Sequence, residues 1–367
     1  MSKSVLSQGS LILVCVDPFR LLHLMETVLM TANRTGANGS VGGAVSLQIL
    51  KAGYHLRAVV RNEEKGGYLR EGLKAQGYGE ESVQVVLVPD MAAPGSLDEA
   101  LKGCIAIAHV ASDVSFAHNP NEVITPTLAL LQSVLESAAK TASIKRFVYT
   151  SSTGVLPLLD QKVHLTPSSW VSSTIVDKAW SEPYGPENKA TIYCASKYLS
   201  EKACWDFVRD RKPHFELNVV VPNSHVGAFL HPKLIGSLNG IVWGMWIGDE
   251  FAVSVSHMIV GLNGLINLED SGLLHLAALT QSDVSGERLL GIGEVFTHDD
   301  LIDVMAKIDP DRKLPPKMGK DCPVAHATVD MERSFELTRR LGKAEWTGVE
   351  ESVRQLVDSM APYVQGE

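Results

Sequence analysis

The sequence is poor in cysteine and carries no excess of positive charge. Its five cysteines form no C-x-x-C pair and no Cys/His cluster with zinc spacing, so we expect reduced thiols and no metal site. The formal net charge of −9 gives no electrostatic footprint for nucleic acid or for an anionic membrane. We therefore expect no nucleic-acid partner, no membrane partner and a cytoplasmic location.

Long uninterrupted apolar runs are also absent. Residues 11–30 are hydrophobic on average, but Asp17, Arg20, His23 and Glu26 interrupt them, which excludes a membrane span. A signal peptide is not expected, because the uncharged apolar run covers only about six residues and no small-residue cleavage site follows it. No repeat or low-complexity tract is found.

The 367 residues do contain short apolar runs that alternate with helical patterns. This alternation predicts an α/β fold with a doubly wound parallel sheet, the Rossmann architecture. Strands are predicted at 11–14, 54–60, 83–88, 105–110, 147–150 and 217–221, and helices at 42–51, 63–76, 96–102, 121–140 and 188–210. Past Pro222 the alternation is lost. We predict a nucleotide-binding domain over 1–225 and a smaller, mostly substrate-binding lobe over 226–367, with 286–300 returning to the main domain.

A glycine-rich loop, TGANGSVGG at 35–43, precedes a predicted helix. Its glycines let the chain turn sharply and let a phosphate approach the backbone N–H groups at the positive end of that helix. This is typical of a dinucleotide-binding loop, although glycines at this spacing also occur in plain turns. The candidate cofactor-binding residues are Thr35, Gly36, Asn38, Gly39, Ser40, Val41 and Gly42.

Arg61 ends the strand predicted after this loop, 19 residues beyond Gly42. Dinucleotide-binding folds place the residue that selects the ribose at this point, and a guanidinium suits the 2′-phosphate of NADP. A solvated surface arginine is the alternative, and Glu63 and Glu64 lie close by. The pattern favours NADP(H) as the cofactor.

Tyr193 and Lys197 lie four residues apart, on one face of a predicted helix. A tyrosine is a poor acid–base group near neutral pH unless a nearby cation lowers its pKa, and Lys197 can supply that charge. The pair could then protonate a carbonyl oxygen while hydride reaches the carbon. Tyr198 and Lys202 have the same spacing, but the small residues that follow Tyr193 would let a cofactor approach closely.

A run of hydroxyl residues, Thr150 to Thr153, follows the strand predicted at 147–150. Open α/β sheets bind ligands at the carboxyl ends of their strands, so one of these hydroxyls could bond a substrate carbonyl. A polar strand end that caps a loop is an equally good interpretation of this run alone.

Taken together, these motifs resemble an extended short-chain dehydrogenase/reductase. The chain is similar to fungal NADPH-dependent aldehyde and ketone reductases related to dihydroflavonol reductases. The resemblance covers residues 8–14 and 35–360, and its motifs are TGANGSVGG (35–43), PDM (89–91), HVAS (109–112), YTSST (149–153), YCASK (193–197), VPN (221–223) and WTGVEES (346–352).

The resemblance implies a role for each matching residue. Ser152, Tyr193 and Lys197 would be the catalytic set, with Lys197 also holding the nicotinamide ribose. The implied cofactor contacts are Asp90 and Met91 at the adenine, Ala111 and Ser112 along the cofactor path, and Pro222 and Asn223 near the nicotinamide.

Residues 15–34 have no counterpart in that family pattern. Removing them joins the predicted strand at 11–14 directly to the loop, which suggests a retained intron or a gene-model error. The alternative is a real helical excursion, because its apolar residues recur at helical spacing. The excursion could loop out, or residues 28–30 could replace the expected strand. In either case we predict weaker cofactor binding than in a chain that lacks 15–34.

The leading hypothesis is an NADPH-dependent reductase that converts a small carbonyl substrate to an alcohol, as a monomer or homodimer. An NAD(P)-dependent alcohol or steroid-type dehydrogenase, a sugar epimerase and a non-catalytic NADP-sensing protein are the alternatives. Arg61 argues against the NAD preference usual for epimerases, and the tyrosine–lysine pair argues against a sensor. By analogy, the substrate is a ketone of fungal secondary metabolism such as a polyketide. Phe116, Trp243 and Trp246 either line an apolar pocket or pack in a core.

Overall fold

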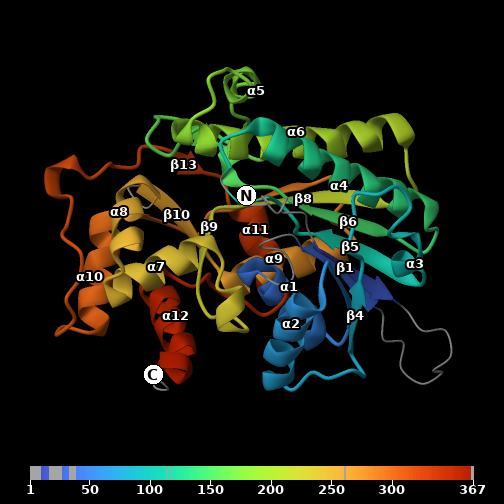
Figure 1. Cartoon of the computed structure of the whole chain (residues 1–367), viewed down its shortest axis with the longest axis horizontal. Coiled ribbons are helices and arrows are strands. Elements are labelled where there is room, and N and C mark those ends of the chain that lie inside the picture. The colour runs from blue at the N-terminus through green and yellow to red at the C-terminus, as the bar shows by residue number, and fades with distance from the viewer. Residues whose placement is uncertain are drawn as a thin grey trace, which may run out of the picture.

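A computed structural model describes residues 10–15, 27–32, 39–113, 115, 117–259 and 262–364. In this part of the chain, eight strands form one twisted sheet in the order β11-β8-β6-β5-β1-β2-β3-β4 (Figure 1). The strands are β1 (Ser10–Cys15), β2 (Thr27–Ala32), β3 (His55–Val60), β4 (Val83–Leu87), β5 (Cys104–His109), β6 (Arg146–Thr150), β8 (Glu216–Pro222) and β11 (Arg288–Gly291). All pairings except those of β1 are parallel, which confirms the doubly wound parallel sheet.

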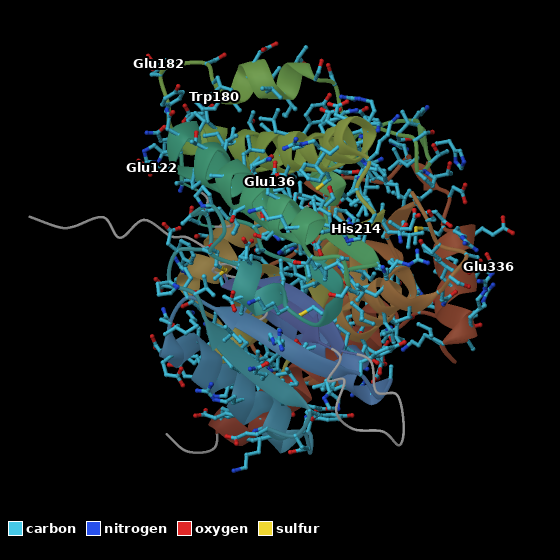
Figure 2. All side chains as sticks on the ribbon, turned by 90° about the vertical axis from the view of Figure 1, so that its right-hand side faces the viewer. Glu122, Glu136, Trp180, Glu182, His214 and Glu336 are labelled. Carbon is cyan, nitrogen blue, oxygen red and sulfur yellow. The ribbon has the colours of Figure 1, made fainter. Side chains whose placement is uncertain are left out.

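Helices cover both faces of this sheet. On one face lie α1 (Ser40–Lys51), α2 (Glu63–Ala75) and α9 (Leu268–Thr280), and on the other α4 (Pro120–Lys140) and α6 (Lys189–Arg211) (Figure 1). The buried residues of α4 recur every three or four positions, from Val123 through Leu130 and Val134 to Ala138, so the helix has one apolar stripe. Glu122 and Glu136 project from its outer side (Figure 2). Three shorter helices complete this domain: α3 (Asp98–Leu101), α5 (Thr174–Ala179) and α11 (Glu332–Arg340). In addition, β7 (His164–Leu165) pairs with β13 (Thr328–Val329).

The strand predicted at 11–14 does form, as β1, but it is not one of the parallel strands of the sheet. β1 runs antiparallel to β3 and β5. It is β2 that runs parallel to β5, with Val28 opposite Ala106 and Met30 opposite Ala108. β1 and β2 pair antiparallel with each other, so of these two strands only β2 runs in the same direction as β3 and β5. Residues 28–30 therefore take the place expected for 11–14, and both strands pair with Ile107.

A second, smaller lobe follows β8. Its sheet has the order β12-β10-β9, and its helices are α7, α8, α10 and α12. The bounds are β9 (Ser224–Val226), β10 (Leu262–Asn267), β12 (Glu294–Thr297), α7 (Ser237–Ile247), α8 (Glu250–Ile259), α10 (His298–Ile308) and α12 (Val349–Val364). This lobe has its own apolar core, which includes Val242, Met305 and Leu356. The segment predicted to return at 286–300 is divided, because β11 joins the main sheet while β12 pairs with β10.

Candidate active site

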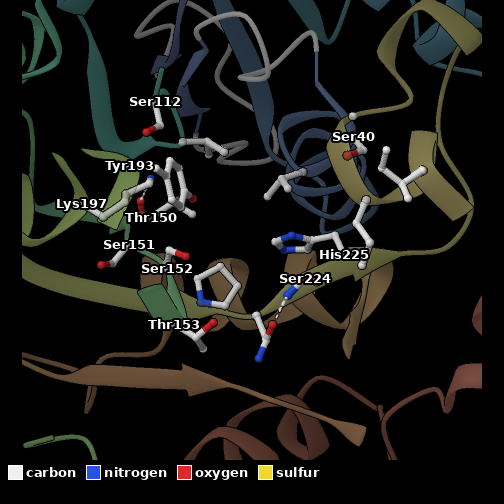
Figure 3. A pocket seen from close by; sticks show the side chains of 17 residues that line it. Ser40, Ser112, Thr150, Ser151, Ser152, Thr153, Tyr193, Lys197, Ser224 and His225 are labelled. Carbon is white, nitrogen blue, oxygen red and sulfur yellow. Dashed lines mark hydrogen bonds between the residues drawn. The ribbon is translucent and has the colours of Figure 1, made fainter. Parts of the chain in front are cut away.

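A cleft lies where the two lobes meet, at the carboxyl ends of β6 and β8 (Figure 3). Its wall combines the start of α1, the end of β6, the inner face of α6, the segment after β8 and the start of α7. The lining residues that carry the argument are Ser40, Ser112, Ser152, Tyr193, Lys197 and His225.

The structure brings the three predicted catalytic residues together in this cleft. Tyr193 and Lys197 stand one turn apart on α6, and Ser152 follows β6 by two residues. The Ser152 hydroxyl forms a hydrogen bond with the Tyr193 phenol. Tyr198 lies outside the cleft lining, with its ring edge-on to Trp170 at a centroid distance of 5.6 Å. The geometry thus distinguishes the two tyrosine–lysine pairs that spacing left open.

The expectation that Lys197 lowers the pKa of Tyr193 is not met. Burial raises the pKa of Tyr193 to about 12, and the hydrogen bond with Ser152 only partly opposes this effect. Desolvation disfavours the phenolate, and in this arrangement its effect exceeds any cationic stabilisation. The phenol is therefore protonated at neutral pH, which is the form that can donate a proton.

Lys197 is almost completely buried, with 3% of its surface exposed. Its Nζ donates a hydrogen bond to the Thr150 carbonyl oxygen at 2.9 Å. Burial lowers the pKa of Lys197 to about 7, and the Glu201 carboxylate one turn further along α6 opposes that shift. The ammonium therefore loses its proton near neutral pH rather than far above it.

Sequence reasoning missed the polar network around these residues. His275 on α9 bonds the Thr150 hydroxyl through Nε2 at 2.8 Å, and its Nδ1 lies 2.7 Å from the Ser271 carbonyl oxygen. His225, which lines the cleft, bonds the Ser271 hydroxyl at 2.9 Å. Burial lowers the pKa of His225 to about 3 and that of His275 to about 4, so both rings are neutral. These contacts join segments far apart in sequence, and no motif signals them.

The residues predicted to bind the cofactor lie in different settings. Ser40 and Val41 begin α1 and line the cleft, as do Ser112, Pro222 and Asn223. Arg61 directly follows β3 at the same edge of the sheet, and Ala111 is buried beside Ser112. Asp90 is exposed and accepts a hydrogen bond from the Ala92 N–H at 3.1 Å, whereas Met91 is buried in the core. Thr35, Gly36 and Asn38 lie outside the described residues.

Two observations fit a dinucleotide at this cleft. The Ser112 hydroxyl is buried in its wall and has no hydrogen-bond partner within the part of the chain that the structure describes. Helix α1 begins at Gly39 with no side-chain cap and no acidic residue in its first turn. The N-terminus of a helix attracts an anion such as a pyrophosphate, and no acidic side chain in this turn opposes one. Together with the fold, this arrangement defines an NAD(P)H-binding oxidoreductase.

Comparison with known proteins gives the family. Residues 36–187 match the NAD(P)H-binding family model. The chain is 32% identical to aldehyde reductase 2 of Sporidiobolus salmonicolor, over 98% of both sequences, and 28% identical to ketoreductase nvfG of Aspergillus novofumigatus, over 89% of this chain and 95% of that protein. The structure of the yeast methylglyoxal/isovaleraldehyde reductase Gre2 with NADPH matches with a TM-score of 0.70 and 20% identity, over 90% and 97% of the two chains. The chain belongs to the family of fungal aldehyde reductases and ketoreductases.

Both tryptophans considered for the pocket belong to the core of the smaller lobe. Trp246 is buried in the core of the smaller lobe, with the Arg312 guanidinium 4.2 Å from its ring centroid. Trp243 packs against the same core, and Phe116 lies outside the described residues. No helix of the described chain is long and apolar enough to cross a membrane.

Proposed function

We propose that this protein reduces the carbonyl group of a small molecule to an alcohol and prefers NADPH. The observation that carries the proposal is the convergence of Ser152, Tyr193 and Lys197 in one cleft beside the open N-terminus of α1. When bound, the cofactor supplies the hydride. Arg61 follows β3 and is the residue we assign to the 2′-phosphate.

The catalytic side chains have distinct roles. The Ser152 hydroxyl donates a hydrogen bond to the substrate carbonyl oxygen and holds it beside Tyr193. The Tyr193 phenol, protonated because its pKa is raised to about 12, transfers its proton to the oxygen that becomes the alcohol. The Lys197 ammonium stabilises the negative charge left on the phenol and bonds the nicotinamide ribose.

The protonation state of Tyr193 at neutral pH is the one that reduction requires. Reduction needs a phenol that gives a proton, whereas oxidation of an alcohol needs a phenolate that takes one. The first form is present at neutral pH without any further ionisation. We propose that the protein works in the direction of reduction, on a carbonyl of fungal secondary metabolism, as a cytoplasmic monomer or homodimer.

NADPH consumption measured against a panel of aliphatic and aromatic aldehydes, ketones and polyketide-type carbonyls tests the proposal. Tyr193→Phe should reduce kcat by about 10²–10⁴-fold, because it removes the proton donor. Tyr198→Phe is the matched control, since it removes a hydroxyl from the same helix outside the cleft, and it should retain activity. Full activity in Tyr193→Phe would contradict the mechanism.

A further inference from the structure

A buried ion pair lies directly behind the catalytic residues. Glu201 on α6 and Arg288 on β11 have side chains with 0% and 6% of their surface exposed. The Arg288 Nε donates to Glu201 Oε1 at 2.6 Å, and its Nη2 lies 3.4 Å from Oε2. Such pairs do not by themselves stabilise a fold, because desolvation of both charges offsets their attraction. The presence of the Glu201–Arg288 pair at this position therefore needs an explanation other than stability.

The second oxygen of Glu201 holds the strand end that carries the catalytic serine. The Ser151 hydroxyl donates to Glu201 Oε2 at 2.5 Å, so this hydroxyl is engaged by α6. Neighbouring side chains of an extended segment point in opposite directions, and Ser152 accordingly faces Tyr193 (Figure 3). The hydrogen bond to Glu201 thus fixes the Ser151 hydroxyl and leaves Ser152 as the serine that bonds Tyr193.

The carboxylate of Glu201 is held from several sides. Besides Arg288 and Ser151, the Trp205 indole donates to Oε1 at 3.3 Å. Arg288 is itself fixed, because its Nη1 donates to the carbonyl oxygens of Pro167 and Ser169 and its guanidinium lies 4.0 Å from the Trp170 ring centroid. These donors hold the carboxylate in place.

Glu201 is also the charged group that faces Lys197. The titratable groups near this ammonium are Glu201 and Cys204 on α6, Tyr149 on β6, His109 on β5, His225 on β9 and His275 on α9. Burial lowers the pKa values of the three histidines to about 3–4 and raises those of Cys204 and Tyr149, so all five are neutral at pH 7. Within the described chain, the negative charge that opposes the desolvation of Lys197 comes from Glu201.

We propose that Glu201 is a positioning residue for the reduction: its carboxylate fixes the Ser151 hydroxyl and so sets the adjacent Ser152 against Tyr193, and its charge favours the Lys197 ammonium. Arg288 keeps that carboxylate in place. The inference rests on the proposed reductase function. Glu201 has two effects: it orients the strand end through Ser151, and it raises the pKa of Lys197.

The charge effect is measured without activity, by the pH titration of the Lys197 ¹³Cε signal in the full-length protein, assigned with Lys197→Met. We expect the wild-type midpoint near pH 7. In Glu201→Gln the midpoint should fall by about 1 unit or more, because an opposite charge at close range is lost. Glu201→Asp keeps the charge and should titrate like the wild type. Trp205→Phe removes only a neutral hydrogen bond to the same carboxylate and is the matched control.

The orientation effect is measured by kinetics. Ser151→Ala should lower kcat without moving the Lys197 midpoint, whereas Glu201→Gln should lower kcat and move it. A fall of one unit from pH 7 alone reduces the protonated fraction of Lys197 at pH 7 about fivefold. If Glu201→Gln does not fold, Glu201→Gln combined with Arg288→Met removes both charges and is titrated in its place.

An unchanged Lys197 midpoint in these variants would overturn the charge effect, and full kcat in Ser151→Ala would overturn the orientation effect. A wild-type protein that binds NADPH but reduces no carbonyl would refute the proposed function instead. The titration result would still stand in that case, so the two failures are distinguishable.

Discussion

At Gly272, α9 packs closely against α1, the helix whose start lines the cleft. A Cβ atom at this position would lie 2.8 Å from the Ala44 carbonyl oxygen and 2.8 Å from the Gln48 Cγ. Ordinary contact begins at 3.4 Å, so the backbone of α1 must move by about 0.6 Å to admit one methyl group. The Gln48 side chain can turn aside, but the Ala44 carbonyl belongs to the helix itself. Gly272→Ala therefore displaces α1.

The change in the free energy of unfolding follows from two opposing contributions. Overpacking of this kind costs about 1–3 kcal/mol, while replacing glycine by alanine inside a helix returns about 1 kcal/mol. Gly67→Ala on α2 is the matched control, because its Cβ would meet nothing within 4 Å and gains only the helical term. We expect Gly67→Ala to be more stable than Gly272→Ala by about 1–3 kcal/mol in urea unfolding.

The same displacement should reach the cofactor site, because Ser40 and Val41 lie at the start of α1 and line the cleft. We expect the Kd for NADPH, from fluorescence titration, to rise about threefold to tenfold in Gly272→Ala and to stay unchanged in Gly67→Ala. Equal stability of the two variants together with an unchanged Kd in Gly272→Ala would refute this reasoning.

Three further predictions concern the cofactor and the acid–base groups. Arg61→Ala should raise the Kd for NADPH about tenfold to a hundredfold, which corresponds to the loss of one charge-assisted hydrogen bond, and should leave the Kd for NADH unchanged. An equal rise in both Kd values would exclude Arg61 as the 2′-phosphate ligand. Deleting residues 15–34 should lower the Kd for NADPH, because residues 11–14 would then lead directly into the glycine loop. Equal NADPH affinities of the two chains would contradict this prediction. Transcript sequencing shows whether the segment is encoded. The kcat/KM of the wild type should fall as pH rises through about 7, because Lys197 acts as the ammonium and its pKa is lowered to that value. No further loss from Tyr193 should occur below about pH 12, and a flat profile across neutral pH would contradict the role of Lys197.

The sequence allowed the fold and much of the site to be predicted. Parallel strands alternate regularly with helices, so residues after 150, near 193 and after 221 must meet at one edge of the sheet. The helix over α6 was predicted at 188–210 and is found at Lys189–Arg211. That accuracy is enough to place Tyr193 and Lys197 on one face.

The features that escaped prediction depend on burial and on contacts between distant segments. Glu201 and Arg288 are 87 residues apart, and no pattern signals that they meet. The raised pKa of Tyr193 results from its burial in the assembled cleft, whereas the spacing alone suggested a lowered pKa. The place of β2 was also ambiguous, because its apolar residues fit a helical spacing as well as a strand.

The central claim is that Tyr193 protonates the carbonyl oxygen of the substrate while the carbonyl carbon receives hydride from NADPH. The most direct test uses NADPH deuterated at the transferring C4 position, with a carbonyl substrate from the panel and mass spectrometry of the alcohol. The account predicts one deuterium on the new carbinol carbon with the wild-type protein and with Tyr198→Phe, and formation slowed about 10²–10⁴-fold with Tyr193→Phe. An alcohol without deuterium, or equal rates in the Tyr193→Phe and wild-type proteins, would contradict it.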